Sequence, residues 1–147
     1  MSVALVVIDM QRVFATGTPW ASPDYPAAEA GVRALLPAFA GRAVFTRYVA
    51  PAEPEGAWVG YFEQWPFALV PADDPLYELM LDPGDAPVVT RTTFGKWGPE
   101  LAAATGGAEA IVLAGVSTDC CVLSTALAAA DAGVGVTVVA DACAGAS

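Results

Sequence analysis

The chain has 147 residues, a length that suits one domain over residues 1–147, and 56% of them are hydrophobic. No apolar run approaches the ~18 residues that cross a bilayer, and a formal net charge of −10 repels nucleic acid, so we expect neither a membrane nor a nucleic acid as a partner. The chain contains no histidine, which excludes Ser-His-Asp and Cys-His catalysis and zinc sites with imidazole ligands.

Five apolar runs rich in β-branched residues predict the strands of a parallel sheet. The first is apolar at every position, as is typical of a strand that is covered on both faces, and the same interpretation applies to the others. In chain order they are Val3–Ile8, Ala43–Tyr48, Pro87–Thr90, Ala110–Val116 and Val134–Ala140.

Helical patterns separate several of these strands. The first helix has an apolar face formed by Val32, Leu35, Leu36 and Phe39. It ends at Gly41, and Pro37 is expected to strain or kink it. A second, alanine-rich helix is predicted over residues 123–132. Strands that alternate with helices predict an α/β fold with a doubly wound, mostly parallel sheet flanked by helices.

Residues 49–86 do not fit this alternation. The segment contains repeated prolines, one plausible short helix at residues 76–81, and a dense set of aromatic side chains. So many rings argue against disorder, and we interpret the segment as an ordered excursion that walls a pocket. Rings that cap the sheet or bury an oligomer interface are the alternative. The candidates for substrate binding are Phe14, Trp58, Phe62 and Trp65.

The cysteines and the N-terminus bear on the cellular compartment. Three cysteines are an odd number and none has CxxC spacing, so neither a disulfide framework nor a thiolate zinc site is favoured. The first residues lack the basic region of a signal peptide and run directly into an apolar stretch. We therefore expect a reducing, cytoplasmic environment.

Polar residues follow the apolar strands at their carboxyl ends, where open α/β sheets bind ligands. Asp9 follows the first strand and Arg91 the third, while Cys120 and Cys121 would lie in the first turn of a helix after the fourth. Backbone N–H groups and the helix dipole in such a turn favour a thiolate and can bind an oxyanion. Without histidine, Asp9 is the available base, and Arg91 or the sole lysine, Lys96, is the balancing cation.

Each of these residues taken alone has an ordinary structural explanation. A cysteine in a first helical turn is commonly a small buried hydrophobic residue, and a strand-terminal aspartate commonly belongs to a turn. Arginine and lysine are commonly solvated. The convergence of a base, a cation and a thiol at three strand ends is what indicates catalysis.

Two motifs resemble those of the isochorismatase-like cysteine hydrolases. Residues 4–11, ALVVIDMQ, are similar to the opening motif of that family, and residues 115–122, GVSTDCCV, to its nucleophile motif. Residues 141–142 also fit, and the resemblance covers essentially the whole chain. It implies a hydrolase that cleaves a C–N amide-type bond of a small-molecule substrate through a thioester, without a cofactor. Vinyl-ether hydrolysis of the isochorismatase type and a catalytically silent binding or scaffold protein are the alternatives.

The resemblance also implies roles for particular residues. Asp9 matches the general base and Cys121 the nucleophile, whereas Cys120 falls on a variable position. A cis peptide bond is implied between Val116 and Ser117, which would turn the N–H groups of Ser117 and Cys121 into an oxyanion hole.

The chain departs from the family pattern in three respects. The family's lysine aligns with Arg91, which we prefer to Lys96 for the cationic role because it lies at the strand end. The metal-binding Asp and His residues of nicotinamidases have no counterparts, so no metal site is expected. The chain stops at Ser147, whereas family members usually continue with another helix and an edge strand. We therefore expect a fragment or a chain that depends on a partner subunit, most simply in a homo-oligomer.

Overall fold

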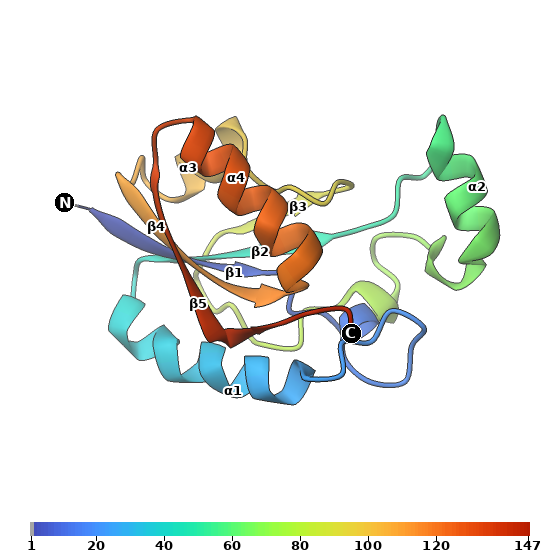
Figure 1. Ribbon diagram of the computed structural model, residues 1–147, viewed down its shortest axis with the longest axis horizontal. Coiled ribbons are helices and arrows are strands. Elements are labelled where there is room, and N and C mark those ends of the chain that lie inside the picture. The colour runs from blue at the N-terminus through green and yellow to red at the C-terminus, as the bar shows by residue number, and fades with distance from the viewer. Residues whose placement is uncertain (1) are drawn as a thin grey trace.

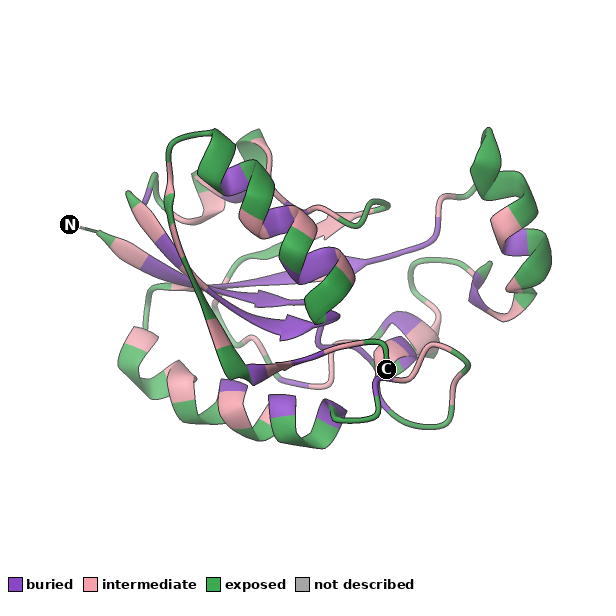
Figure 2. Ribbon diagram, in the orientation of Figure 1, coloured by how far each residue is buried: buried purple, intermediate pink, exposed green. Residues whose placement is uncertain are grey.

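The computed structural model describes residues 2–147 and contains, over that range, one five-stranded parallel sheet (Figure 1). In spatial order the strands are β3 (Val88–Arg91), β2 (Ala43–Tyr48), β1 (Val3–Ile8), β4 (Ala110–Val116) and β5 (Gly135–Ala144). β1 lies at the centre and is almost completely buried, as Figure 2 shows for the middle of the sheet. The predicted doubly wound parallel sheet is confirmed.

Helices cover both faces of the sheet. α1 (Tyr25–Leu35) packs on one face against β4 and β5, and α3 (Pro99–Ala104) and α4 (Leu123–Asp131) lie on the other (Figure 1). Side chains of β1 alternate between these layers, so that Leu5 and Val7 pack beneath α1 whereas Val6 and Ile8 pack beneath α3 and α4. This coverage on both sides explains why β1 has no polar face.

The first helix has the irregularity expected from Pro37. α1 ends at Leu35, and the chain continues as a 3-10 helix, Leu36–Phe39, with the proline near its start. α1 also comes unusually close to β5, because a Cβ atom at Gly31 would lie 2.7 Å from Cα of Ala142. A glycine at this position therefore permits the contact between helix and strand.

Residues 49–86 are ordered, but their elements differ from the prediction. The segment contains α2 (Ala57–Gln64) and the 3-10 helices Pro66–Ala68 and Pro75–Tyr77. The short helix expected at residues 76–81 is wrong, because Leu79 instead forms an antiparallel bridge with Gln11. α2 lies beyond the carboxyl ends of the strands, to the right in Figure 1. Among residues 2–147, no helix combines the length and the apolar character needed to cross a membrane.

The last strand is longer than predicted. β5 runs through Asp141 to Ala144, and its pairing with β4 changes register between Leu113 and Gly115. This irregularity adds residues to β5 opposite β4, so the strand continues past the polar residue that marked its end in the sequence.

Candidate active site

The candidate site lies where the winding of the sheet reverses. β1 and β4 are adjacent although they are distant in sequence, so the segments that follow them leave the sheet side by side. Asp9 follows β1 with a φ of 49°, and Cys121 lies in a π-helical turn, Thr118–Val122, between β4 and α4. Gly115 permits this arrangement, because its φ is 125° and a Cβ atom there would collide with the carbonyl oxygen of Ile8.

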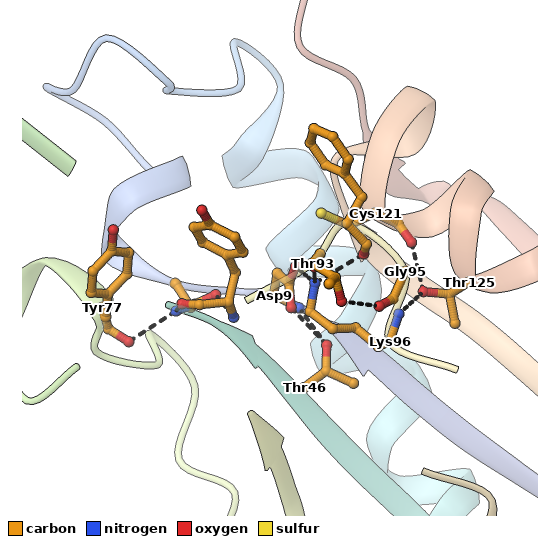
Figure 3. Close-up of polar contacts among 11 residues, drawn as sticks. Asp9, Thr46, Tyr77, Thr93, Gly95, Lys96, Cys121 and Thr125 are labelled. Atoms are coloured by element: carbon orange, nitrogen blue, oxygen red, sulfur yellow. Dashed lines mark hydrogen bonds and ion pairs between the residues drawn. The ribbon is translucent and has the colours of Figure 1, made fainter. Parts of the chain in front are cut away.

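A completely buried ion pair forms the floor of the site. Lys96 Nζ lies 2.9 Å from Asp9 Oδ2, and neither side chain is exposed (Figure 3). The ammonium group also donates to the carbonyl oxygens of Thr93, at 2.6 Å, and Phe94, at 2.9 Å. The ammonium thus pairs with one carboxylate oxygen and donates to two backbone carbonyls. The Thr46 hydroxyl donates to Asp9 Oδ1 at 2.7 Å, so both carboxylate oxygens also have partners.

Arg91 does not occupy the position preferred for it in the sequence. Its guanidinium donates to the carbonyl oxygen of Trp97 at 2.8 Å, and the structure brings Lys96 rather than Arg91 to Asp9. The reason is the strand order: β2 separates β3 from β1, so the end of β3 lies about 10 Å, or two strand spacings, from the end of β1. The loop after β3 folds back toward β1, so the Lys96 side chain reaches Asp9.

The Cys121 thiol lies beside this ion pair and is 5% exposed. Burial raises the pKa of the thiol, and the negative charge of Asp9 raises it further, while Lys96 opposes both effects. These effects favour the protonated thiol, whereas the helix dipole alone was expected to favour a thiolate. The Asp9 carboxylate beside the thiol is a group that can accept its proton.

The backbone before the turn has the expected conformation. The peptide bond between Val116 and Ser117 is cis. Ser117 occupies the N-cap position of the turn, where its carbonyl oxygen accepts hydrogen bonds from the N–H groups of Cys120 and Val122. Ser117 and Cys121 both line the same cavity, so the two residues proposed for an oxyanion hole lie at one site.

This cavity has a volume of about 190 Å³ and opens above the thiol. Aromatic side chains dominate its wall, and among residues 2–147 no charged side chain lines it. The lining residues are Phe14, Pro19, Trp20, Ala21, Tyr48, Trp58, Tyr61, Thr92, Phe94, Ser117, Cys120, Cys121 and Ala146. Asp9 and Lys96 lie beneath this surface rather than in it.

The four predicted substrate-binding rings divide into two groups. Phe14 and Trp58 line the cavity. Phe62 and Trp65 do not. Phe62 is buried behind Tyr61, with ring centroids 5.4 Å apart, and Trp65 packs against Trp20 in a T-shaped arrangement. These two rings support the wall from behind.

The substrate-binding candidates from the sequence did not include four further aromatic residues of the wall, Trp20, Tyr48, Tyr61 and Phe94. Trp20 stacks on Phe14 with an interplanar angle of 12°, and Phe94 lies 5.6 Å from Trp58, measured between ring centroids. Both lie in irregular loops, where no periodicity indicates which way a side chain points. Tyr48 was detectable as the polar-tipped last residue of the second predicted strand.

The donor set does not fit a metal ion. Over residues 2–147 there is no group of three or more Cys, Asp or Glu side chains that could hold one, and the chain has no histidine. The buried carboxylate of Asp9 already contacts the Thr46 hydroxyl and the Lys96 ammonium. No step of the proposed chemistry is assigned to a metal.

One hydroxyl group connects the lysine loop to the cysteine turn. The completely buried Thr125, on α4, accepts a hydrogen bond from the Lys96 N–H at 3.0 Å and donates to the Cys121 carbonyl oxygen at 2.7 Å. Figure 3 shows both bonds as dashed lines. Thr125 thus fixes the position of the Lys96 loop relative to the cysteine turn.

Replacing Thr125 by valine is expected to lower the free energy of unfolding by about 1–3 kcal/mol, because it leaves a buried N–H and a buried carbonyl without their partner. Denaturant unfolding measures the change. Thr125→Ser keeps the hydroxyl and should recover most of the loss, and Thr137→Val, on an exposed position of β5, is a matched control with little effect. A Thr125→Val protein as stable as the control would contradict the assignment.

Comparison with known proteins gives the family. The model of the Isochorismatase domain matches residues 3–147. No curated protein matches the chain.

Several solved structures share the fold. A cysteine hydrolase from Pseudomonas syringae pv. phaseolicola superposes with a TM-score of 0.87 at 18% identity, over 98% of this chain and 73% of that one. The N-carbamoylsarcosine amidase of Thermoplasma acidophilum gives 0.80 at 22% identity, over 98% and 84%. The pyrazinamidase of Pyrococcus horikoshii, solved in complex with zinc, gives 0.79 at 23% identity, over 100% and 88%. At these identities the structures show a common fold, whereas the match to the family model shows membership of the family. The resemblance of the two sequence motifs is thereby confirmed, and the chain belongs to the Isochorismatase domain family.

Proposed function

We propose that this chain is a cysteine hydrolase that cleaves a C–N amide-type bond of a small molecule through a thioester on Cys121. One observation carries the proposal: the Cys121 thiol, at the floor of an aromatic cavity, lies beside the Asp9 carboxylate, which a buried lysine holds in place. A base in contact with a nucleophile, and itself oriented by a third group, is the arrangement that nucleophilic catalysis requires.

In the proposed reaction, the substrate carbonyl lies above Cys121. Asp9 accepts the thiol proton as sulfur attacks the carbonyl carbon, so a thiolate forms only when it is used. The N–H groups of Ser117 and Cys121 would stabilise the negative charge on the carbonyl oxygen. Asp9 then donates the proton to the leaving nitrogen, and the C–N bond breaks to give an amine and a thioester.

Water completes the cycle. Asp9 removes a proton from water as the oxygen attacks the thioester, and that proton returns to sulfur when the C–S bond breaks. Lys96 takes no part in these transfers, because it stays paired with Asp9 and donates to two backbone carbonyls. Its proposed role is to orient Asp9 and balance its charge.

The two alternative functions receive less support. Vinyl-ether hydrolysis does not require a cysteine in contact with the base. A silent binding protein is suggested by Arg91 at the position of the family's lysine, but Lys96 supplies the cation to Asp9 instead. Both observations favour the thioester mechanism.

Ammonia release from a panel of small primary amides tests the proposal. Cys121→Ser is expected to lower kcat/KM by at least about 10³-fold, because the hydroxyl is a far weaker nucleophile beside a carboxylate base. Intact-mass measurement of the quenched wild-type reaction should show one acyl group on Cys121. Cys143→Ser is the matched control and should retain activity. A Cys121→Ser protein that hydrolyses amides at the wild-type rate would exclude the thioester mechanism.

A further inference from the structure

The side chain of Gln11 continues the sheet at the point where β1 ends. The pairing of β1 with β2 stops at Val7 and Phe45, whereas β2 continues to Tyr48. Without a strand beside them, the N–H and the carbonyl oxygen of Tyr48 on that side would lack partners in the interior. Gln11 supplies both, because its Oε1 accepts from the Tyr48 N–H at 2.8 Å and its Nε2 donates to the Tyr48 carbonyl oxygen at 2.8 Å. An amide side chain thus takes the place of a strand.

The same amide binds a third segment. Its Nε2 also donates to the carbonyl oxygen of Tyr77, at 3.0 Å, in the 3-10 helix Pro75–Tyr77. The Tyr77 ring in turn packs against the Tyr48 ring in a T-shaped arrangement, with centroids 6.0 Å apart. Gln11 has no exposed surface, so water cannot replace these hydrogen bonds. It is the last residue of the opening motif, and the proposed mechanism gives it no role.

Two side chains near the end of β2 contact the acid and the cation of the site. The Thr46 hydroxyl donates to Asp9 Oδ1 at 2.7 Å and accepts from the Asp9 N–H at 3.2 Å. The Tyr48 ring centroid lies 5.6 Å from Lys96 Nζ, within the range of a cation–π interaction. The position of the Asp9–Lys96 pair therefore depends on where Gln11 holds the end of β2.

The backbone of Gln11 also contacts Asp9 directly. Asp9 leaves β1 with a φ of 49°, a left-handed conformation that residues other than glycine keep only where their surroundings hold it. The Gln11 N–H donates to the Asp9 carbonyl oxygen at 2.8 Å within this turn. The side chain of Gln11 fixes the far end of the same turn to β2.

We propose that Gln11 is a positioning residue for the hydrolysis: by completing the end of β2, it fixes Tyr48 against Lys96 and thereby holds the Asp9–Lys96 pair beside the cysteine turn. The inference rests on the proposed function, because it adds a residue to that reaction. Gln11 is not among the residues that line the cavity, so it acts through Tyr48.

Ammonia release by Gln11→Met tests the proposal, because methionine has a similar length and forms none of these hydrogen bonds. The substitution should lower kcat by about 10–10²-fold, since a small misplacement of a catalytic group has an effect of that size. KM should change much less, because Gln11 lies outside the cavity. A loss confined to KM would mean that Gln11 supports only the wall and would overturn the inference.

Val32→Ala controls for loss of stability. Val32 is completely buried between α1 and the sheet and does not line the cavity, so the substitution destabilises the fold without touching the site. Unfolding of both variants in denaturant shows whether their stabilities match. Val32→Ala should keep the wild-type kcat, and an equal loss of kcat in the two variants would show a merely structural role for Gln11.

Tyr48→Leu tests the path by which Gln11 acts. It removes the ring from Lys96 and should lower kcat as Gln11→Met does. The double variant Gln11→Met, Tyr48→Leu should have the kcat of Tyr48→Leu, because two residues on one path do not contribute independently. Losses that multiply in the double variant overturn the inference. If Gln11→Met fails to fold, an unchanged kcat in Tyr48→Leu overturns it as well.

Alkylation of Cys121 by iodoacetamide separates this inference from the proposed function, because it requires no turnover. In a Cys120→Ser, Cys143→Ser background, Gln11→Met should speed alkylation by about 3-fold or more, since displacement of Tyr48 and Asp9 exposes the thiol. Val32→Ala should leave the rate unchanged. This result with a wild type that hydrolyses no amide supports the role of Gln11 and removes the hydrolase. Unchanged alkylation and kcat in Gln11→Met overturn the inference and leave the hydrolase intact.

Discussion

Replacing Lys96 by methionine is expected to lower the free energy of unfolding by about 3–5 kcal/mol and to abolish hydrolysis. Methionine is similar in length but cannot pair with Asp9, so a completely buried carboxylate would keep only the Thr46 hydroxyl among its side-chain partners. The carbonyl oxygens of Thr93 and Phe94 lose a donor as well. Denaturant unfolding and ammonia release measure the two effects.

Arg91→Met is the matched control, because it removes the other cation considered for the same role. Arg91 is partly exposed and donates to one backbone carbonyl, so the substitution should cost about 1 kcal/mol and leave most of the activity. Adding Asp9→Asn to Lys96→Met should recover part of the lost stability, because the unpaired charge is then removed. Inactivation by Arg91→Met with an active Lys96→Met protein would reverse the assignment.

Asp9→Asn is expected to lower kcat/KM by about 10²–10⁴-fold while making the Cys121 thiol more acidic. The negative charge of Asp9 raises the pKa of the thiol and Lys96 lowers it, so removing the carboxylate shifts the pKa downward. Since the thiolate is the reactive form, alkylation by iodoacetamide speeds up as the pH rises. The curve of alkylation rate against pH should move to lower pH in Asp9→Asn, so reactivity toward iodoacetamide increases while turnover is lost.

The measurement requires a protein in which Cys121 is the remaining thiol. The three cysteines are free, so a Cys120→Ser, Cys143→Ser background supplies it. Asp131→Asn, at the exposed end of α4, should change neither the alkylation curve nor turnover. Slower alkylation of Asp9→Asn across the pH range would contradict the position assigned to the carboxylate.

The parts of the fold that the sequence predicts are those determined by burial. The run Val3–Ile8 is apolar at every position because β1 is covered on both faces, and this pattern identifies a central parallel strand without further information. Asp9 and the cysteine turn could be placed at one site because the ends of parallel strands lie at the same edge of a sheet.

The choice between Lys96 and Arg91 depends on loop conformation, which periodicity does not describe. Strand position favours Arg91, but β3 is an edge strand and β2 separates it from Asp9. Lys96 reaches the carboxylate because its loop supplies two backbone carbonyls that complete the coordination of the ammonium. A sequence contains no direct signal for such backbone acceptors.

The aromatic wall shows a similar limit. Aromatic density in residues 49–86 indicates an ordered segment, yet Phe62 supports the wall from behind whereas Trp58 lines it. α2, which carries both rings, has eight residues and only Phe62 buried, so it lacks the two-turn apolar stripe by which a helix is recognised.

The complete burial of the Lys96–Asp9 pair separates it from the salt in the surrounding solution. Dissolved ions weaken an exposed pair such as Arg12–Glu78, whose side chains are 50% and 61% exposed, because they approach both charges. No ion of the solvent can approach a pair whose side chains have no exposed surface. The attraction between Lys96 and Asp9 should therefore depend little on ionic strength. By contrast, salt strongly screens the net charge of −10 of the molecule as a whole.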